Sequence, residues 1–289
     1  MSTILESTAW PNRSPLLLPH TFPDQSATTD DIERSATMPG SRNVASFLRA
    51  REARADTQRP KSGKASAGRN RARPRLLTLP EQIAEQLAQD IVSQTLVPGQ
   101  RLKEMELANQ FGASRAPIRE ALRLLELRGL VQIEARRGVS VTQLSAAEVD
   151  DLYEIRASLL GLAARRVALT RDEEFLARAE ARLQRLRQYA STPLYGKYFG
   201  ATYELSNLIG QAAGSARLFS LISSFSQQVA RYTRLSLQGL DRRKHSLQNW
   251  EHLIKAIRAR DAEAAEQVQK ELVFGSRDKV REIIAQQPR

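Results

Sequence analysis

The sequence predicts a mainly α-helical chain in three parts: a disordered basic extension over residues 1–76, a winged helix-turn-helix over 77–143 and an all-helical bundle over 144–289. Three observations support this prediction. The first part has no sustained hydrophobic period, a pattern of helix, turn, helix and short hairpin fills residues 98–142, and helical periodicity then continues almost to the C-terminus. The hydrophobic content of 41% is enough for a packed core.

The helix expected after residue 114 has a start signal, a stop signal and two distinct faces. Ser114 is a good N-cap residue, Pro117 falls in the first turn, where its missing N–H costs little, and Gly129 ends the helix. One face is suited to packing and the other to entry into a DNA major groove. The packing face carries Ile118, Ala121, Leu122 and Leu125, and the other face carries Arg115, Arg119 and Arg123 at four-residue spacing.

A short hairpin is expected directly after this helix. Apolar residues alternate on both sides of the turn sequence Arg136-Arg137-Gly138. This pattern predicts two strands joined by a cationic tip. The apolar positions are Leu130, Val131, Ile133, Val139 and Val141.

Two helices are expected before the arginine-bearing helix. Pro80 opens the first, which has an apolar stripe at four-residue spacing and is closed by Pro98-Gly99. The second runs from about Glu104 to Phe111 and precedes the turn Gly112-Ala113-Ser114. The stripe consists of Ile83, Leu87 and Ile91.

Six helices are expected in the C-terminal part. Ser145 with Glu148, and Thr170 with Glu173, read as capping boxes that open the first two of them. Gly239 and the two basic residues after Asp241 mark a break before the last helices. The other four helices are expected over 193–213, 215–238, 243–259 and 261–286.

Charge and composition restrict which classes of protein this chain can belong to. The formal charge is +12, but residues 1–78 contribute about +6, residues 79–143 about zero and the remainder about +6. DNA binding by the winged helix must therefore depend on where its arginines lie and not on bulk charge. The chain has no cysteine and no apolar run long enough to cross a membrane, so we expect no membrane partner and a reducing, cytoplasmic location.

The basic stretch between residues 49 and 75 has three open interpretations. It carries ten Lys or Arg residues against Glu52 and Asp56, a composition that binds phosphate backbones without reading sequence. It is an auxiliary DNA-binding arm, a solvated tail, or the product of a start codon assigned too far upstream, with Met38 as an internal start.

Residues 98–142 resemble the GntR family of bacterial transcription regulators. The resemblance rests on many residues at fixed spacing, which makes it a specific signal. The matching positions are Pro98, Gly99, Leu102, Glu104, Leu107, Ala108, Ser114, Arg115, Pro117, Arg119, Glu120, Ala121, Leu122, Leu125, Gly129 and Leu130. The resemblance implies DNA contacts by Arg101, Lys103, Ser114, Arg115, Ala116, Arg119, Arg123, Arg136, Arg137 and Gly138.

The C-terminal part is similar to the FCD domain, the effector-binding domain of the FadR-like branch of that family. The similarity lies in Val149 to Ala164, in Leu208 to Leu218 and in Glu251 to Asp261. Many FCD domains hold a divalent metal with one Asp and three His. The corresponding positions here are Thr202, Ser206, His252 and Leu272, so we expect no metal and no cofactor.

Without a metal, an anionic effector must be held by arginine and hydroxyl groups. The candidate effector is an organic acid or an acyl-CoA. His252 has two interpretations, as a hydrogen-bonded inner histidine or as a direct ligand contact. The candidate effector-binding residues are Arg156, Thr202, Ser206, Arg231, Tyr232 and His252.

These resemblances imply a transcription regulator, a repressor, that binds a double-stranded operator with a short inverted repeat as a homodimer and responds to a small molecule. The alternative is a constitutive or architectural DNA-binding protein whose effector pocket has degenerated. No nucleophile elbow, phosphate loop or paired-carboxylate motif occurs, so we do not expect an enzyme.

Overall fold

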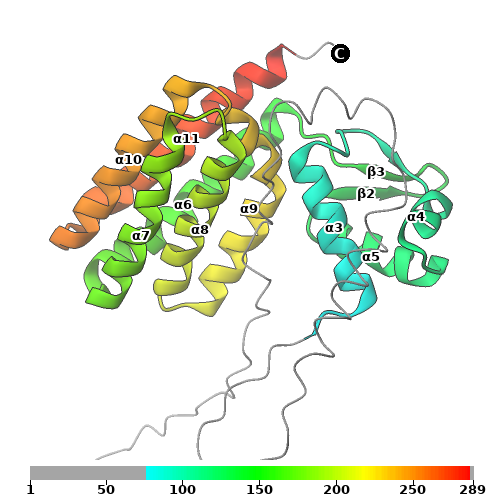
Figure 1. Cartoon of the computed structure of the whole chain (residues 1–289), viewed down its shortest axis with the longest axis horizontal. Coiled ribbons are helices and arrows are strands. Elements are labelled where there is room, and N and C mark those ends of the chain that lie inside the picture. Colours follow the sequence, from blue (N-terminus) through cyan, green and yellow to red (C-terminus); the bar gives the residue numbers. More distant parts are fainter. Residues whose placement is uncertain (1–75, 287–289) are drawn as a thin grey trace, which may run out of the picture. The chain divides into compact units, whose positions relative to one another are not determined.

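The computed structural model describes residues 76–286, which form two compact units (Figure 1). One unit consists of residues 76–151, 226–235 and 280–286, and the other of residues 152–225 and 236–279. The predicted mainly α-helical fold with a small sheet is confirmed. Residues 1–75 of the predicted disordered extension lie outside the described residues.

The first helix, α3 (Leu79–Ser93), begins with a capping box that the sequence analysis did not identify. Glu81 N donates to Thr78 Oγ1 at 3.4 Å, and Thr78 N donates to a Glu81 carboxylate oxygen at 2.8 Å. The helix ends at Ser93, followed by the C-cap residue Gln94 with a φ of 69°, and so stops earlier than the expected end at Pro98-Gly99. A turn fills the difference, in which Leu96 N donates to Asp90 O.

The next two helices, α4 (Glu104–Phe111) and α5 (Arg115–Leu127), are separated by the predicted tight turn. Gly112 has a φ of 60°, a conformation that favours glycine. Ser114 occupies the predicted N-cap position of α5, but its side chain makes no capping hydrogen bond. Gly129 follows the end of α5 with a φ of 70°, as expected for a glycine that stops a helix.

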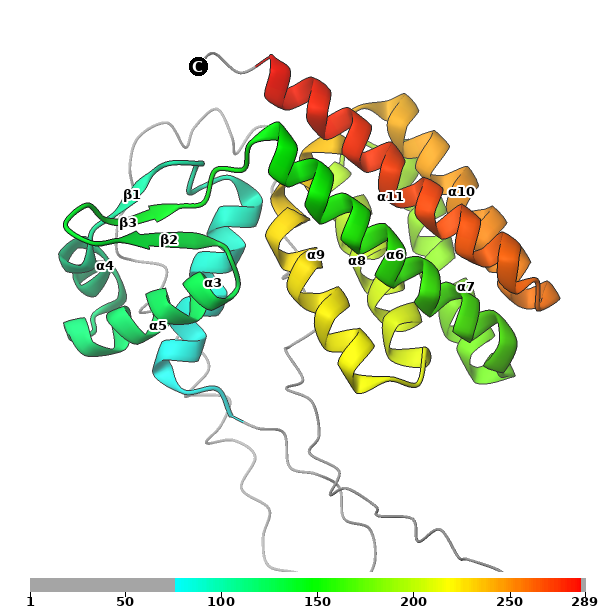
Figure 2. The same cartoon turned by 180° about the vertical axis from the view of Figure 1, so that it is seen from behind.

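Three antiparallel strands form the wing in the order β1-β3-β2 (Figure 2). These are β1 (Arg101–Leu102), β2 (Val131–Glu134) and β3 (Gly138–Val141). The hairpin of β2 and β3 confirms the prediction, whereas β1 was not predicted. A two-residue strand has no alternation to detect, and only its pairing with β3 identifies it.

The helices and the sheet of this unit share one hydrophobic core. The predicted stripes of α3 and α5 both face it. Ile133 of β2 is 40% exposed, so it does not belong to this core as the alternation suggested. The most completely buried members are Ile83, Ala84, Leu87, Ile91, Ile118, Ala121, Leu122, Leu125, Val131 and Val141.

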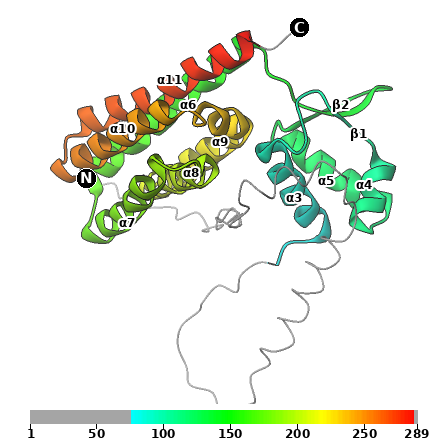
Figure 3. The same ribbon diagram turned by 45° about the horizontal axis from the view of Figure 1, so that its top comes forward.

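Six helices form the bundle in the C-terminal part, in the predicted order. Their bounds are α6 (Ala146–Thr170), α7 (Glu173–Ala190), α8 (Tyr195–Ala212), α9 (Ala216–Ser236), α10 (Leu240–Ala259) and α11 (Ala262–Ala285). Figures 2 and 3 show α11 alongside α6, and Arg165 of α6 pairs with Glu266 of α11 at 3.6 Å. Within residues 76–286, no helix is both long enough and apolar enough to cross a membrane.

The two predicted capping boxes of the bundle have different outcomes. Ser145 and Glu148 form the reciprocal hydrogen bonds at the start of α6, as predicted. The prediction for Thr170 is wrong, because this residue ends α6 and donates to Arg166 O. Asp172 caps α7 instead, accepting from Phe175 N at 2.7 Å. Thr and Asp are both suitable N-cap residues. Because α6 extends to Thr170, that residue is still helical and Asp172 becomes the cap of α7.

Arg243 is a buried arginine of α10 that connects the C-terminal end of α7 to the C-terminal end of α9. Since α10 starts at Leu240, directly after the predicted break at Gly239, Arg243 lies in its first turn. Its guanidinium donates to four backbone carbonyls that no helix hydrogen bond satisfies. The acceptors are Ala190 O at 3.1 Å, Thr192 O at 2.8 Å, Leu237 O at 2.9 Å and Gln238 O at 2.6 Å.

We predict that Arg243→Ala lowers the free energy of unfolding by roughly 3 kcal/mol or more, because it leaves buried carbonyls without donors. Urea unfolding followed by circular dichroism measures this change. The matched control is Arg217→Ala, which removes an exposed arginine of α9 and should cost less than about 0.5 kcal/mol. Equal losses in both variants would contradict the proposed capping role of Arg243.

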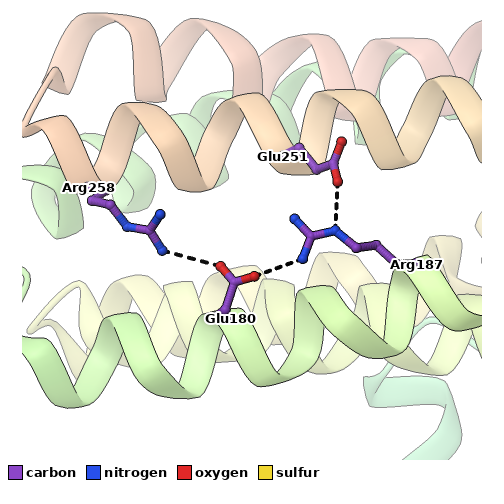
Figure 4. Close-up of polar contacts among 4 residues, drawn as sticks. All are labelled: Glu180, Arg187, Glu251 and Arg258. Carbon is purple, nitrogen blue, oxygen red and sulfur yellow. Dashed lines mark hydrogen bonds and ion pairs between the residues drawn. The ribbon is translucent and has the colours of Figure 1, made fainter.

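An ion-pair network links α7 to α10 (Figure 4). Glu180 accepts from Arg187 at 2.8 Å and from Arg258 at 3.2 Å, and Arg187 also pairs with Glu251 at 2.8 Å. The hydrogen bond from Arg187 is the main cause that lowers the pKa of Glu180. A lowered carboxyl pKa means stability that is present above the ordinary Glu pKa of 4.5 and is lost as the pH falls through the lowered value.

We therefore predict that Glu180→Gln destabilises the protein at pH 7, by no more than about 1 kcal/mol because the pairs are solvent-screened. The difference from the unsubstituted protein should vanish as the pH falls through the lowered pKa of Glu180. Thermal unfolding across a pH series tests this, with Glu263→Gln on exposed α11 surface as the control. A difference that persisted in strong acid would show that packing, and not charge, holds this contact.

Candidate functional site

The exposed face of α5 is the first candidate site. Burial of Ile118, Leu122 and Leu125 in the core directs the opposite side of the helix to the surface. All three arginines of the predicted DNA-reading face are exposed there. The face is therefore both rigidly supported and accessible, as insertion into a major groove requires.

Two of these arginines are held by side chains of α4. Arg119 Nε donates to Glu104 Oε2 at 2.8 Å, and Arg115 donates to Met105 Sδ. Arg123 has no side-chain partner within residues 76–286. The sequence analysis did not identify Glu104 and Met105 as part of the site. Their position at the start of α4 was visible in the sequence. Their contact with the arginines was not, because it depends on how α4 packs against the start of α5.

The wing tip is built by two unusual backbone conformations. Glu134 pairs with Gly138 across the hairpin, which leaves residues 135–137 as the loop. Arg136 has a φ of 65° and Gly138 a φ of 86°, so the chain reverses tightly and projects its arginines. Arg137 is 3.4 Å from Glu134, an exposed and weak pair.

All ten residues predicted to contact DNA are exposed. Besides α5 and the wing tip, they include Arg101 of β1 and Lys103, which pairs with Glu106 at 2.7 Å. Exposed pairs of this kind contribute little to stability and exchange readily for phosphate contacts. The ten are Arg101, Lys103, Ser114, Arg115, Ala116, Arg119, Arg123, Arg136, Arg137 and Gly138.

Three effector candidates lie in the interior of the helical bundle. Arg156 of α6 is 7% exposed, and Thr202 and Ser206 are buried one turn apart on α8. Burial lowers the pKa of Arg156, and the nearby phenols of Tyr153 and Tyr203 oppose this shift. The Thr202 hydroxyl donates to Phe199 O at 2.7 Å, so its proton is used within α8. Arg156 is the cationic side chain of the three.

His252 does not lie in this interior. It is exposed on α10, so the interpretation as an inner histidine is wrong. The sequence pattern around it resembles a family motif, but helix rotation decides which side of α10 faces the core, and Leu253 and Ile254 are buried instead. Within residues 76–286, no group of three or more acidic or histidine side chains is arranged to hold a metal ion.

The last two candidates, Arg231 and Tyr232 of α9, contact the segment that follows the wing. Leu144 N donates to the Tyr232 hydroxyl at 2.9 Å, and Arg231 Nη2 donates to Thr142 O at 3.0 Å and to the same hydroxyl. Both side chains are buried. Arg231 Nε and Nη1 are buried without a hydrogen-bond partner among the described residues. These two candidates therefore organise backbone of their own unit.

Sequence reasoning missed two features of the bundle. A cavity of about 320 Å³ lies at the junction of α6, α7 and α8, and Arg171 and Arg178 are among its lining residues. None of the six effector candidates lines it. Arg242 of α10 is partly buried, donates to Gly275 O at 3.2 Å and to Ser276 Oγ at 3.1 Å, and has its pKa lowered by burial. Neither the cavity nor the contacts of Arg242 could be predicted from the sequence, because each depends on the packing of helices that are distant along the chain.

Comparison with known proteins agrees with this geometry. Residues 79–141 match the family described as bacterial regulatory proteins, gntR family, and residues 151–273 match the FCD domain. The HTH-type transcriptional repressor RspR of Escherichia coli is 28% identical over 203 residues, which is 70% of this chain and 89% of RspR.

Other similarities are more local or concern the fold alone. The uncharacterized HTH-type transcriptional regulator YdhC of Bacillus subtilis is 46% identical over 103 residues, 36% of this chain and 46% of YdhC, so the match spans about half of that relative. The solved structure of E. coli McbR/YncC has a TM-score of 0.61 at 20% identity and covers 69% of this chain and 95% of that one.

A winged helix with an exposed arginine face, joined to a helical bundle, defines a class of DNA-binding transcription regulators. Within that class the chain belongs to the GntR family and carries a C-terminal FCD effector-binding domain. Its family and relatives are transcription regulators and not enzymes.

Proposed function

We propose that this GntR regulator is a cytoplasmic repressor that binds a short inverted repeat in DNA as a homodimer and is released or retained by a small-molecule effector. The observation that carries the proposal is the exposed arginine face of α5 on a well-packed winged helix. Two such faces related by a two-fold axis match the two half-sites of an inverted repeat.

In this proposal Arg115 and Arg119 read guanines, and the wing and β1 residues contact phosphates. Before binding DNA, Arg119 must leave Glu104, and this exchange is inexpensive because Arg119 is 60% exposed. Base contacts by arginine supply specificity, whereas Arg136, Arg137 and Lys103 supply affinity that depends on salt.

The proposed effector is an organic acid or an acyl-CoA, held without a metal or another cofactor. Buried Arg156 supports an anionic ligand, because an internal guanidinium favours a carboxylate or phosphate. Ser206 and Thr202 are further candidates in the same interior. Arg231 and Tyr232, whose side chains contact residues 142–144, are also candidates for binding the effector. His252 remains a candidate only for a contact at the surface of α10.

The second candidate function is a constitutive DNA-binding protein with a degenerate effector pocket. It is favoured by the engaged hydroxyl of Thr202 and the exposed His252. A thermal-shift screen with organic acids and acyl-CoAs, each with and without chelator, separates the two functions. A ligand that binds the native state must raise the melting temperature, whereas the constitutive protein shows no shift with any member.

We predict that Arg115→Ala or Arg119→Ala weakens operator binding by about 1–3 kcal/mol and changes binding to random DNA much less, because each removes a base contact. Fluorescence anisotropy with operator and scrambled duplexes measures both affinities. Arg217→Ala, outside the winged helix, is the control and should alter neither. Equal losses on operator and scrambled DNA would refute base reading by these arginines.

We also predict that deletion of residues 1–75, which lie outside the described residues, leaves operator selectivity intact. The deletion removes 13 Lys or Arg and 7 Asp or Glu. Any contribution of this stretch to DNA binding must appear as a shallower slope of log affinity against log salt. A shortened protein that folds but no longer distinguishes operator from random DNA would contradict its accessory status.

A further inference from the structure

The cavity at the junction of α6, α7 and α8 is lined by charged as well as apolar side chains. Its volume of about 320 Å³ lies at the lower end of the range of roughly 300–1,000 Å³ that small-molecule pockets occupy. Figure 1 shows this end of the bundle at the bottom, where α6 leads into α7 and α8 leads into α9. The cavity is therefore large enough for a metabolite the size of an amino acid.

Two arginines line the cavity, and both have unused hydrogen-bond donors. Arg171 donates to Arg258 O at 2.8 Å and to Glu173 at 3.3 Å, yet its Nε is buried without a partner among the described residues. Arg178 Nη1 lies 3.7 Å from Glu174 Oε1, too far for a hydrogen bond, and its guanidinium donates no hydrogen bond within residues 76–286. A guanidinium with free donors matches a ligand carboxylate.

Two carboxylates, those of Asp172 and Glu174, line the same cavity. One oxygen of Asp172 accepts from Phe175 N at 2.7 Å, and its second oxygen accepts no hydrogen bond from the part of the chain that the structure describes. Glu174 is exposed and makes only the loose pair with Arg178. These groups repel a purely anionic ligand and attract an ammonium group. Equal numbers of cationic and anionic lining groups therefore favour a zwitterion.

Apolar side chains complete the wall. Val167, Phe175 and Leu208 are buried, and Ala212 adds a small side chain near the end of α8. A wall of this kind stabilises an aliphatic or aromatic group by removing it from water. The three kinds of lining group thus correspond to the carboxylate, the ammonium group and the side chain of an apolar α-amino acid.

We propose that this cavity binds an α-amino acid with an apolar side chain. Arg178 and the Nε of Arg171 hold its carboxylate, Asp172 and Glu174 hold its ammonium group, and the apolar wall contacts its side chain. None of the six effector candidates lines the cavity. The site is therefore separate from the anionic effector of the proposed function and does not depend on it.

Isothermal titration calorimetry of the full-length protein with L-valine, L-leucine, L-methionine and L-phenylalanine tests this site. At least one of the four should bind, with one equivalent per chain. Analogues of the tightest binder that lack one charged group should bind at least about tenfold more weakly, because each leaves charged groups of the cavity unpaired. For L-leucine these analogues are 4-methylpentanoate, without the ammonium group, and 3-methylbutan-1-amine, without the carboxylate.

Three substitutions locate the binding. Arg178→Gln should raise the Kd of the amino acid at least about tenfold by removing a carboxylate partner, and Ala212→Leu should abolish binding by filling the cavity without changing its charge. Glu174→Gln should reduce the preference for the amino acid over its deaminated analogue, because it removes a repelling carboxylate. Arg217→Gln, on exposed α9 surface, is the matched control and should leave the Kd unchanged.

Circular dichroism verifies that each variant is folded, and Ala212→Val replaces Ala212→Leu if the larger side chain unfolds the protein. The proposal is overturned if none of the four amino acids binds, if the deaminated analogue binds equally well, or if binding survives both Arg178→Gln and the substitution of Ala212. Each of these results leaves the anionic effector of the proposed function standing, since Arg156 lies outside the cavity.

Discussion

The burial of one face of α5 is the constraint on which the DNA-binding unit depends. Ile118, Ala121, Leu122 and Leu125 are almost fully buried against α3 and the sheet, and their helical spacing leaves no freedom in how the helix is rotated. The arginines at four-residue spacing must then face outward. Packing and recognition are therefore two consequences of the same periodicity, and a change that rotated α5 would disturb both.

The helical bundle follows a different rule, because its interior contains guanidinium groups as well as apolar side chains. Arg243 is fully engaged with carbonyls at the ends of two helices, so its charge is stabilised by groups that need donors. Arg242 and Arg231 satisfy only part of their hydrogen-bonding capacity within the described residues. Buried Arg156 supports the anionic ligand of the proposed function, whereas Arg243 stabilises the fold.

Local signals allowed much of the fold to be predicted from the sequence. The limits of α4 and α5, the hairpin and the Ser145 box depend on residues a few positions apart, and all are confirmed. Errors arose where two local signals competed, as with Thr170 and Asp172, or where a partner distant in sequence decides the structure. The strand β1 needs β3, two of the four contacts of Arg243 span more than fifty residues, and the exposure of His252 depends on how α10 packs. The exposure of the candidate DNA-contacting arginines follows from the local periodicity of α5 and could be predicted. The surroundings of the effector candidates depend on packing between distant helices and could not.

Selection of duplexes from a random DNA pool by the full-length protein tests the central claim most directly. An α5 face that reads bases from a two-fold symmetric dimer should enrich an inverted repeat with a guanine at a constant place in each half-site. Enrichment of unrelated sequences without a repeat, or no enrichment above the starting pool, would contradict the account and leave only sequence-independent phosphate binding.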